Sequence, residues 1–232
     1  MRACIGAAVL IAACACARLA DAQDYAGYSG QPGPPRPRVG FQLALRTGLA
    51  VPLGNVDGLP GGEMTNFVSP QVPLFVEIGG KVTPHFFVGG FLGLAFGGPA
   101  GDLRNTCEVS NSTCVAAGAR FGAEVQYHIM PEATANPWIG YGIGYESVAV
   151  AFSEGSRTGT ISYNGFEFAH LMGGVDFRLS RVFGLGPFVN FSVGTYSRTH
   201  YELSGDTTLE GDVRDTATHE WLTAGVRVVF FP

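Results

Sequence analysis

Residues 222–231 constrain the fold more than any other part of the sequence. They read Leu-Thr-Ala-Gly-Val-Arg-Val-Val-Phe-Phe, and successive side chains of a strand point to opposite faces. One face would carry only apolar residues: Leu222, Ala224, Val226, Val228 and Phe230. The opposite face would carry a charge among small residues: Thr223, Gly225, Arg227 and Val229. A strand with these two faces fits a wall that separates the hydrocarbon of a membrane from a polar interior.

Composition narrows the choice of fold. Hydrophobic residues make up 46% of the chain and charged residues only 14%, and Gly occurs 34 times. Beyond residue 22 no apolar run reaches the 18 residues or so that a membrane helix needs. The roughly 210 remaining residues suit one domain. The apolar side chains must therefore fill a core or cover the outside of a barrel.

The first 22 residues predict a secretory signal peptide. Residues 1–2 carry a positive charge, residues 5–17 are apolar, and Ala-Asp-Ala at 20–22 offers a cleavage site. An alternative is lipidation of Cys14, since residues 11–14 resemble a lipobox. Residues 23–38 are rich in Pro and Gly, which predicts an extended periplasmic linker outside any sheet.

Cleavage would leave two cysteines, Cys107 and Cys114, which predict a disulfide in an oxidising compartment. The loop is short, so its closure contributes about 2 kcal/mol. No His or acidic set stands beside the two cysteines at zinc-site spacing, so no metal and no cofactor are expected. Lys81 is the single lysine and the formal net charge is −5, which argues against a nucleic-acid partner.

Alternating segments recur along the rest of the chain. The candidate strands are 39–51, 71–82, 86–97, 115–128, 137–152, 163–179, 186–200 and 217–231. The connections alternate in length: short turns at 83–85, 129–136 and 180–185, and longer loops at 52–70, 98–114, 153–162 and 201–216. Even strand numbers with short turns at one end and long loops at the other are typical of bacterial outer-membrane barrels. Residues 39–232 are therefore predicted to form an all-β, eight-stranded antiparallel up-and-down transmembrane barrel.

Polar residues fall on the predicted inner faces. They are Arg46, Glu77, Lys81, Arg120, Glu124, His128, Asp176, Arg178 and Arg227. Side chains just fill an eight-stranded barrel, and both signs of charge are present, so the residues can pair. Glycines at 140, 142 and 144 would leave room for long arginines. We expect a salt-bridge network that fills the lumen, and the alternative is a narrow conduit whose charges select ions.

Aromatic residues cluster near both ends of the predicted strands. Those near the short turns predict an interfacial girdle: Phe41, Phe86, Tyr127, Trp138, Phe177, Phe188 and Phe230. Near the other end, Phe166, Phe168 and Trp221 either join an upper girdle or line an apolar mouth. Residues 167–170 break the alternation of their strand, which predicts a β-bulge.

An enzymatic site is not expected. Candidate residues for a lipid-modifying site are His170, His200 and His219 with Ser192, Ser197 or Ser204. The sequence contains no Gly-x-Ser-x-Gly motif and no phosphate-binding loop.

Over residues 39–231 the chain resembles small outer-membrane β-barrels of the OmpA, OmpX and OmpW type. The resemblance implies an outer-membrane location, the lipid bilayer as environment, and recognition of the last aromatic strand by the barrel-insertion machinery. It leaves the external partner unknown. The first hypothesis is a non-enzymatic barrel with a structural or surface-interaction role. The alternatives are a narrow conduit for small or hydrophobic solutes, a lipid-modifying enzyme, and a soluble secreted sandwich.

Overall fold

A computed structural model describes residues 39–110, 112–155, 157–203 and 207–231. The predicted signal peptide, Cys14 and the predicted linker at 23–38 lie outside these residues. The elements are β1 (Gly40–Gly54), α2 (Met64–Phe67), β2 (Val72–Lys81), β3 (Phe86–Gly97), α3 (Gly101–Val109), β4 (Thr113–His128), β5 (Ala135–Glu154), β6 (Arg157–Arg178), β7 (Phe183–Leu203), β8 (Thr207–Asp212) and β9 (Thr218–Phe230). Neither of these helices is long and apolar enough to cross a membrane.

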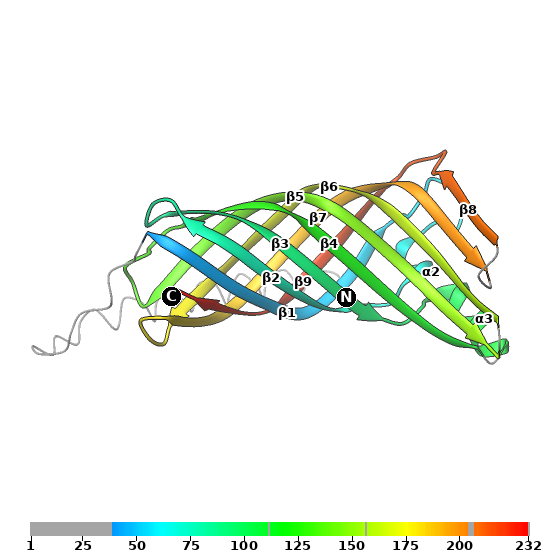
Figure 1. The fold of residues 1–232 in the computed structure, drawn as a ribbon, viewed down its shortest axis with the longest axis horizontal. Helices are drawn as coiled ribbons and strands as arrows, with labels where there is room; N and C mark the ends of the chain where they lie inside the picture. The colour runs from blue at the N-terminus through cyan, green and yellow to red at the C-terminus, as the bar shows by residue number, and fades with distance from the viewer. Residues whose placement is uncertain (1–38, 111, 156, 204–206, 232) are drawn as a thin grey trace, which may run out of the picture.

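Eight strands form a closed antiparallel ring (Figure 1). Each strand from β1 to β6 pairs with the strand that follows it in the chain. β7 then pairs with β9, and β9 pairs with β1, which closes the ring. The closing seam runs from Leu43 opposite Phe230 to Gly54 opposite His219. β8 pairs only with the far part of β7 and lies outside the ring. The structure confirms the predicted eight-stranded barrel.

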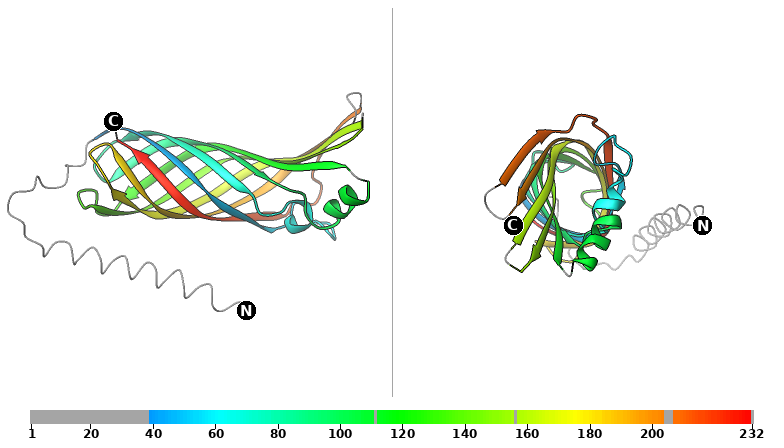
Figure 2. Two further views of the ribbon diagram at one scale, coloured as in Figure 1. Left: turned by 90° about the horizontal axis from the view of Figure 1, so that it is seen from below. Right: turned by 90° about the vertical axis from the view of Figure 1, so that its right-hand side faces the viewer.

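The two ends of the barrel differ. Three short turns, 82–85, 129–134 and 179–182, lie at one end, here called the turn end. The opposite loop end carries α2, α3 and β8, and in Figure 2 the two helices lie against one side of the mouth. The predicted arrangement, with short turns at one end of the barrel and long loops at the other, is confirmed.

The loop end differs in detail from the prediction. Residues 153–162 were expected to form a loop, but β5 and β6 pair as far as Glu154 opposite Arg157. Residues 201–216 were expected to form a loop too, yet they include the end of β7 and all of β8. These segments carry polar residues on both faces, so hydrophobic alternation does not reveal them as strands.

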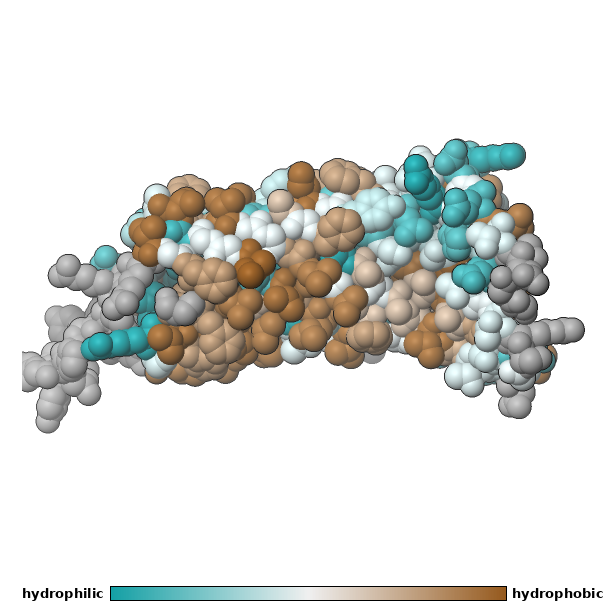
Figure 3. Space-filling model, viewed as in Figure 1, coloured by the Kyte–Doolittle hydropathy of each residue, from teal (hydrophilic) through white to brown (hydrophobic). Residues whose placement is uncertain are grey.

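A band of exposed apolar side chains surrounds the barrel, and Figure 3 shows it on one face. We call it the belt. Its members include Phe41, Leu45, Leu49, Leu74, Ile78, Val88, Leu92, Leu94, Ile139, Tyr141, Ile143, Phe166, Leu171, Val189, Leu222 and Val226. Leu92 is 53% exposed and Val226 is 50% exposed. An apolar surface of this extent would be unstable in water, and it is what a transmembrane barrel presents to lipid.

Strand β6 contains the predicted bulge. Its pairing with β7 shifts between Glu167 and Ala169. Glu167 and His170 are therefore both buried inside, although they stand three positions apart, a spacing that would put them on opposite faces of a regular strand. Phe168, between them, is exposed, and its carbonyl accepts a hydrogen bond from the Tyr141 hydroxyl at 2.7 Å. The bulge thus brings an extra charged pair into the lumen.

Aromatic rings fill the hollows over inward-facing glycines. A Cβ built on Gly93 would lie 2.4 Å from Cε1 of Phe75, and one on Gly144 would lie 3.0 Å from Cζ of Phe91. The Phe91 ring also covers Gly122. The glycine row of β5 was expected to accommodate arginines from across the lumen, but a phenylalanine from β3 covers part of it.

The predicted girdle at the turn end is only partly present. Phe41, Phe86 and Tyr127 are exposed. Trp138 and Phe188, expected in the same girdle, are 1% and 2% exposed and lie inside the barrel. The strand alternation places them on inner faces, where arginines lie against both rings.

Candidate functional site: the barrel interior

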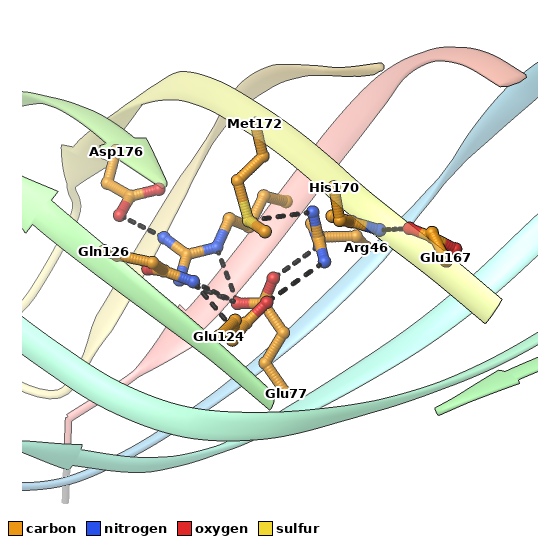
Figure 4. A network of polar contacts seen from close by, with 9 residues as sticks. Arg46, Glu77, Glu124, Gln126, Glu167, His170, Met172 and Asp176 are labelled. Atoms are coloured by element: carbon orange, nitrogen blue, oxygen red, sulfur yellow. Dashed lines mark hydrogen bonds and ion pairs between the residues drawn. The ribbon is translucent and has the colours of Figure 1, made fainter. Parts of the chain in front are cut away.

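The half of the lumen nearer the turn end holds a buried ion network (Figure 4). Glu77 of β2 lies between two arginines from the closing seam. Arg46 Nε of β1 is 2.5 Å from Glu77 Oε1. Arg227 Nη2 of β9 is 2.9 Å from Glu77 Oε2. These three side chains are fully buried, so each charge needs the others as partners.

Three further side chains complete this Arg46–Arg227 network. Asp176 Oδ2 of β6 lies 2.5 Å from Arg227 Nη1, and Glu124 Oε2 of β4 lies 3.6 Å from Arg46 Nη2. The Gln126 amide donates to Glu77 and Glu124 and accepts from Arg227 at 2.9 Å. The network therefore joins strands β1, β2, β4, β6 and β9 across the lumen.

Aromatic rings flank both arginines. The Arg227 guanidinium lies 4.5 Å from the ring centre of Trp138. The Arg46 guanidinium lies 5.1 Å from the ring centre of Phe75 and 5.3 Å from that of Phe188. Contacts of this kind contribute most when the cation is desolvated. They also fill the space around the ion pairs.

Three more of the predicted basic residues, Lys81, Arg178 and His128, lie closer to the turn end. Lys81 is 4% exposed, and its Nζ is 5.2 Å from the Phe231 ring centre. Arg178, half-buried, donates to the Pro131 carbonyl at 3.0 Å and lies 5.4 Å from the same ring. His128 Nδ1 hydrogen-bonds with the Asn136 side-chain amide at 2.7 Å.

A second buried cluster occupies the half nearer the loop end. Its centre is Glu146 of β5, which is 2% exposed. Glu146 accepts from Tyr196 at 2.7 Å, from Trp221 Nε1 at 2.8 Å and from Arg120 Nη2 at 3.2 Å. His219 Nε2 lies 3.2 Å from its second oxygen. We call these five residues the Glu146 cluster.

The β6 bulge contributes a carboxylate–imidazole pair beside this cluster. Glu167 Oε1 contacts His170 Nδ1, and Glu167 Oε2 lies 4.0 Å from Arg120 Nε. The His170 ring lies 4.8 Å from the Phe91 ring centre and 6.0 Å from that of Phe75. Arg120 Nη1 also donates to the Ser192 hydroxyl at 3.4 Å. Arg120 thus links the carboxylate–imidazole pair to the Glu146 cluster.

An apolar layer crosses the lumen above the Glu146 cluster. Its buried members, here called the apolar plug, are Ala50, Val56, Met64, Val68, Ala116, Val148, Val150, Tyr196 and Trp221. Met64 comes from α2 and Val56 from the first long loop, and both are at most 4% exposed. Tyr196 and Trp221 belong to both layers, because their rings pack in the plug while their polar atoms bond to Glu146.

Of the nine residues predicted for the lumen, eight are at most 7% exposed and Arg178 is half-buried. Their predicted functional role stays a prediction. Gln126, Glu146 and Glu167 were not among the residues predicted for the lumen network. Glu146 follows Gly140, Gly142 and Gly144 at the same two-residue spacing along β5, so side-chain alternation alone could have placed it in the lumen. Glu167 was hidden by the bulge, which reverses the phase of β6.

Phe166, Phe168 and Trp221, for which the sequence allowed either an upper girdle or an apolar mouth, do not lie on one side of the wall. Phe166 and Phe168 are 49% and 40% exposed on the outer wall, whereas Trp221 is 1% exposed inside. The phase of β6 before its bulge directs both phenylalanines outward. The three residues therefore do not line a common cavity.

The candidate enzymatic residues are dispersed. His170 and Ser192 face each other across β6 and β7 inside the lumen, at 0% and 1% exposure. His219 belongs to the Glu146 cluster, and His200 lies on the outer side of β7, 3.3 Å from Glu210. Ser204 lies outside the described residues. Within the described ranges, no group of three or more His, Cys, Asp or Glu could hold a metal ion.

The predicted disulfide is present. Cys107 of α3 and Cys114 of β4 are bonded. The bond ties the second long loop to the wall at the loop end. This prediction is confirmed.

Comparisons with known proteins agree on the fold. No family model and no curated protein matches this chain. Among solved structures, a major outer membrane protein from Thermus thermophilus is 13% identical, covers 83% of this chain and 98% of its own, and has a TM-score of 0.56. The outer membrane protein AlkL is 16% identical over 88% and 95%, with a TM-score of 0.46. The outer membrane protease OmpT from Escherichia coli is 9% identical over 84% and 97%, with a TM-score of 0.40.

At 13% identity the likeness to the Thermus thermophilus protein establishes the fold alone, and a shared fold does not decide between a catalytic and a non-catalytic protein. The belt supplies the second observation, because its apolar surface requires lipid around the wall. The chain is a small eight-stranded β-barrel with the fold of outer-membrane barrel proteins.

Proposed function

We propose that this chain is a non-enzymatic barrel with a closed lumen, and that it serves the outer membrane as a structural or surface-interaction protein. The observation that carries the proposal is the succession of filled layers along the lumen. The Arg46–Arg227 network, the Glu146 cluster and the apolar plug follow one another from the turn end to the loop end. An ion crossing the barrel would have to displace all three.

The energetics of the network favour a filled lumen over a pore. Separating a buried ion pair by removing one partner costs about 3–5 kcal/mol. Arg227 alone contacts two carboxylates and Gln126, and Arg46 contacts Glu77 and Glu124. Opening a path would expose several such pairs at once, and the plug adds buried apolar area that favours the closed state.

The placement of the catalytic candidates supports a non-enzymatic role. Glu167, His170 and Ser192 are the side chains nearest to an acyl-transfer arrangement, and each is at most 1% exposed. A general base must reach the proton that it abstracts in a bound substrate. The filled lumen leaves a lipid substrate no approach to these groups. We also propose that β9, with its aromatic end, is the segment read by the insertion machinery.

One observation favours a narrow solute conduit as a second candidate. The side-chain amides of Gln42 and Asn190 are buried without hydrogen-bond partners among the described residues. Thr223 is paired with Asn190 across β7 and β9, and its buried hydroxyl also lacks a hydrogen-bond partner among the described residues. Buried polar groups require partners, and a thin hydrated path along the lumen would supply them.

Conductance in planar bilayers distinguishes the two candidates. The wild-type chain should insert and show no steady ion current above the bare bilayer. Removing one layer, by Arg46→Ala with Glu77→Ala or by Met64→Ala with Trp221→Ala, should leave the barrel closed, because the other layers remain. The fourfold variant lacks both layers and also the Trp221 contact of the Glu146 cluster, so all three layers are disrupted and measurable current steps should appear.

Matched substitutions at the turn end provide the control. Arg181→Ala with Glu132→Ala removes one exposed charge of each sign outside the lumen, and it should not conduct. Every variant is first checked on a denaturing gel for a heat-dependent change in migration, which reports a closed barrel. Steady current through wild-type protein would overturn the closed-lumen proposal and support the conduit, whether or not the fourfold variant folds.

A further inference from the structure

Strands β6, β7 and β8 form a short three-stranded sheet beyond the ring. β6 has 22 residues, about twice the number that a transmembrane strand needs. β7 also runs on to Leu203. There it pairs with β6 on one side and with β8 on the other. In Figure 1 the far ends of these strands lie at the right, past the body of the barrel, with β8 at the upper right.

The outer face of this sheet carries two rows of polar side chains. Asn164, Arg198 and Asp212 are opposite one another on the three strands. Ser162, His200 and Glu210 form the next row. Directly paired residues lie on the same face of a sheet. Phe166 fixes which face this is, because it is exposed in the belt two residues after Asn164.

These rows line a concave surface. A cavity of about 550 Å³ is bounded by both rows together with Tyr145, Thr199 and Gly211. Arg198, Glu210 and Asp212 are exposed, while His200 Nδ1 contacts Glu210 Oε1 at 3.3 Å. We call this cavity the outer groove. It is open to the surroundings of the barrel and separate from the lumen.

The position of the outer groove sets what can reach it. Tyr145 forms its edge and also belongs to the outer wall, where its ring lies 5.8 Å from that of Phe121, a residue 57% exposed. Tyr is typical of the membrane–water boundary, since its ring is apolar and its hydroxyl polar. Figure 3 shows the same change, from brown residues of the belt to teal residues at the upper right. The groove therefore opens at the level of the lipid headgroups.

The chemistry of the outer groove suits hydroxyl groups. Glu210 and Asp212 accept hydrogen bonds, Arg198 donates them, and Asn164 and Ser162 do both. Ligand hydroxyls likewise donate and accept. Two carboxylates against one guanidinium disfavour a bare phosphate as the main occupant, because like charges repel.

We propose that the outer groove binds the saccharide part of a glycolipid headgroup, with the acyl chains of that lipid against the belt below Tyr145. This inference goes beyond the closed-lumen function and does not depend on it. A closed or an open lumen leaves the groove on the outer wall unchanged.

The test measures binding of two probes to the full chain in detergent micelles. One probe is an uncharged diglycosyl diacylglycerol, and the other is its deacylated, water-soluble saccharide; both are titrated calorimetrically in EDTA. Wild-type protein should bind the intact glycolipid at least tenfold more tightly than the free saccharide. Glu210→Gln with Asp212→Asn should weaken glycolipid binding at least tenfold, and Ser162→Trp, which fills the groove, should abolish it.

A matched double variant separates recognition from net charge. Glu108→Gln with Glu154→Gln also neutralises two exposed carboxylates at the loop end, outside the groove, and should bind as wild type does. All variants must show the heat-dependent gel shift. Equal loss in both double variants, tighter binding by Glu210→Gln with Asp212→Asn, or equal affinity for the free saccharide would overturn the proposal. So would binding that appears only when Mg²⁺ replaces EDTA, because the carboxylates would then hold a cation.

Discussion

At the scale of single residues, Glu146 connects the polar lumen to the apolar plug. Its carboxylate accepts hydrogen bonds from Arg120 of β4, Tyr196 of β7 and Trp221 of β9. Two of these donors have their rings in the plug. The one carboxylate thus orients side chains in both layers, and its loss would leave buried donors without an acceptor.

Replacing Glu146 by Ala should lower the free energy of unfolding by about 3–5 kcal/mol, because buried Arg120 then loses its nearer carboxylate and keeps only Glu167, at 4.0 Å, as an ionic partner. Glu146→Gln should cost less, since the amide oxygen still accepts one or two of the bonds. The measurement is guanidinium unfolding in lipid vesicles, followed by tryptophan emission. Both Trp138 and Trp221 are 1% exposed and report the folded lumen.

Glu154→Ala is the control for this prediction, since its side chain is exposed at the end of β5 and should change stability by at most about 0.5 kcal/mol. In an Arg120→Met background, Glu146→Ala should cost less than in wild type, because the two losses share one interaction. Independent, additive effects of the two substitutions would contradict the assigned pair.

Alternation of side chains predicts most of the lumen residues. Arg46 and Arg227 stand on inner faces in unbroken strands, and both are buried there. Their partners within the lumen could not be assigned, because pairing across the barrel depends on strand tilt and stagger, which alternation does not encode. Glu167 could be assigned to the lumen only if the position of the bulge were known to within one residue. A shift of one residue moves every following side chain to the opposite face of the strand.

At the scale of elements, α3 is held by few contacts and one covalent bond. Gly101 begins the helix with a φ of +53°, and a Cβ there would lie 2.7 Å from Asn66 Cα. The second attachment is the disulfide from Cys107 to Cys114 at the start of β4. Neither attachment is part of the backbone hydrogen bonding that closes the barrel.

Replacing both cysteines by Ser should therefore leave the barrel intact and loosen α3. The expected result is an unchanged gel shift and faster hydrogen exchange at the amides of α3, such as Arg104, whose N–H donates to Ala100. Wild-type protein treated with a reductant should behave in the same way. A large fall in the temperature of the gel shift would show that the disulfide supports the ring, contrary to this prediction.

The elements missed by the sequence analysis share one physical cause. Residues 207–212 and the first residues of β6 lie beyond the belt, where neither face needs to be apolar. The alternation that reveals a strand comes from a boundary between lipid and lumen, so it fades outside the membrane. The hairpin of β7 and β8 is maintained by backbone pairing from Arg198 opposite Asp212 to Leu203 opposite Thr207.

At the scale of the whole molecule, the barrel has a side of short strands and a side of long strands. β2 has 10 residues and β3 has 12, close to the span of a membrane, whereas β5, β6 and β7 have 20 to 22. One side of the barrel therefore continues well past the belt, as the left view of Figure 2 shows. The outer groove lies on that continuation.

Arginine substitutions on the outer wall should map where lipid ends. Leu92→Arg puts a charge at an exposed position in the belt, and it should lower the free energy of unfolding in lipid vesicles by about 2–4 kcal/mol. Ala151→Arg puts the same charge at an exposed position of β5 beyond the belt, where the cost should fall to about 0–1 kcal/mol. Guanidinium titration read by the gel shift measures both, and Leu92→Gln separates the loss of an apolar side chain from the gain of a charge. Equal costs at Leu92 and Ala151 would mean that the hydrocarbon boundary is not at the edge of the belt, and the headgroup level assigned to Tyr145 would have to move with it.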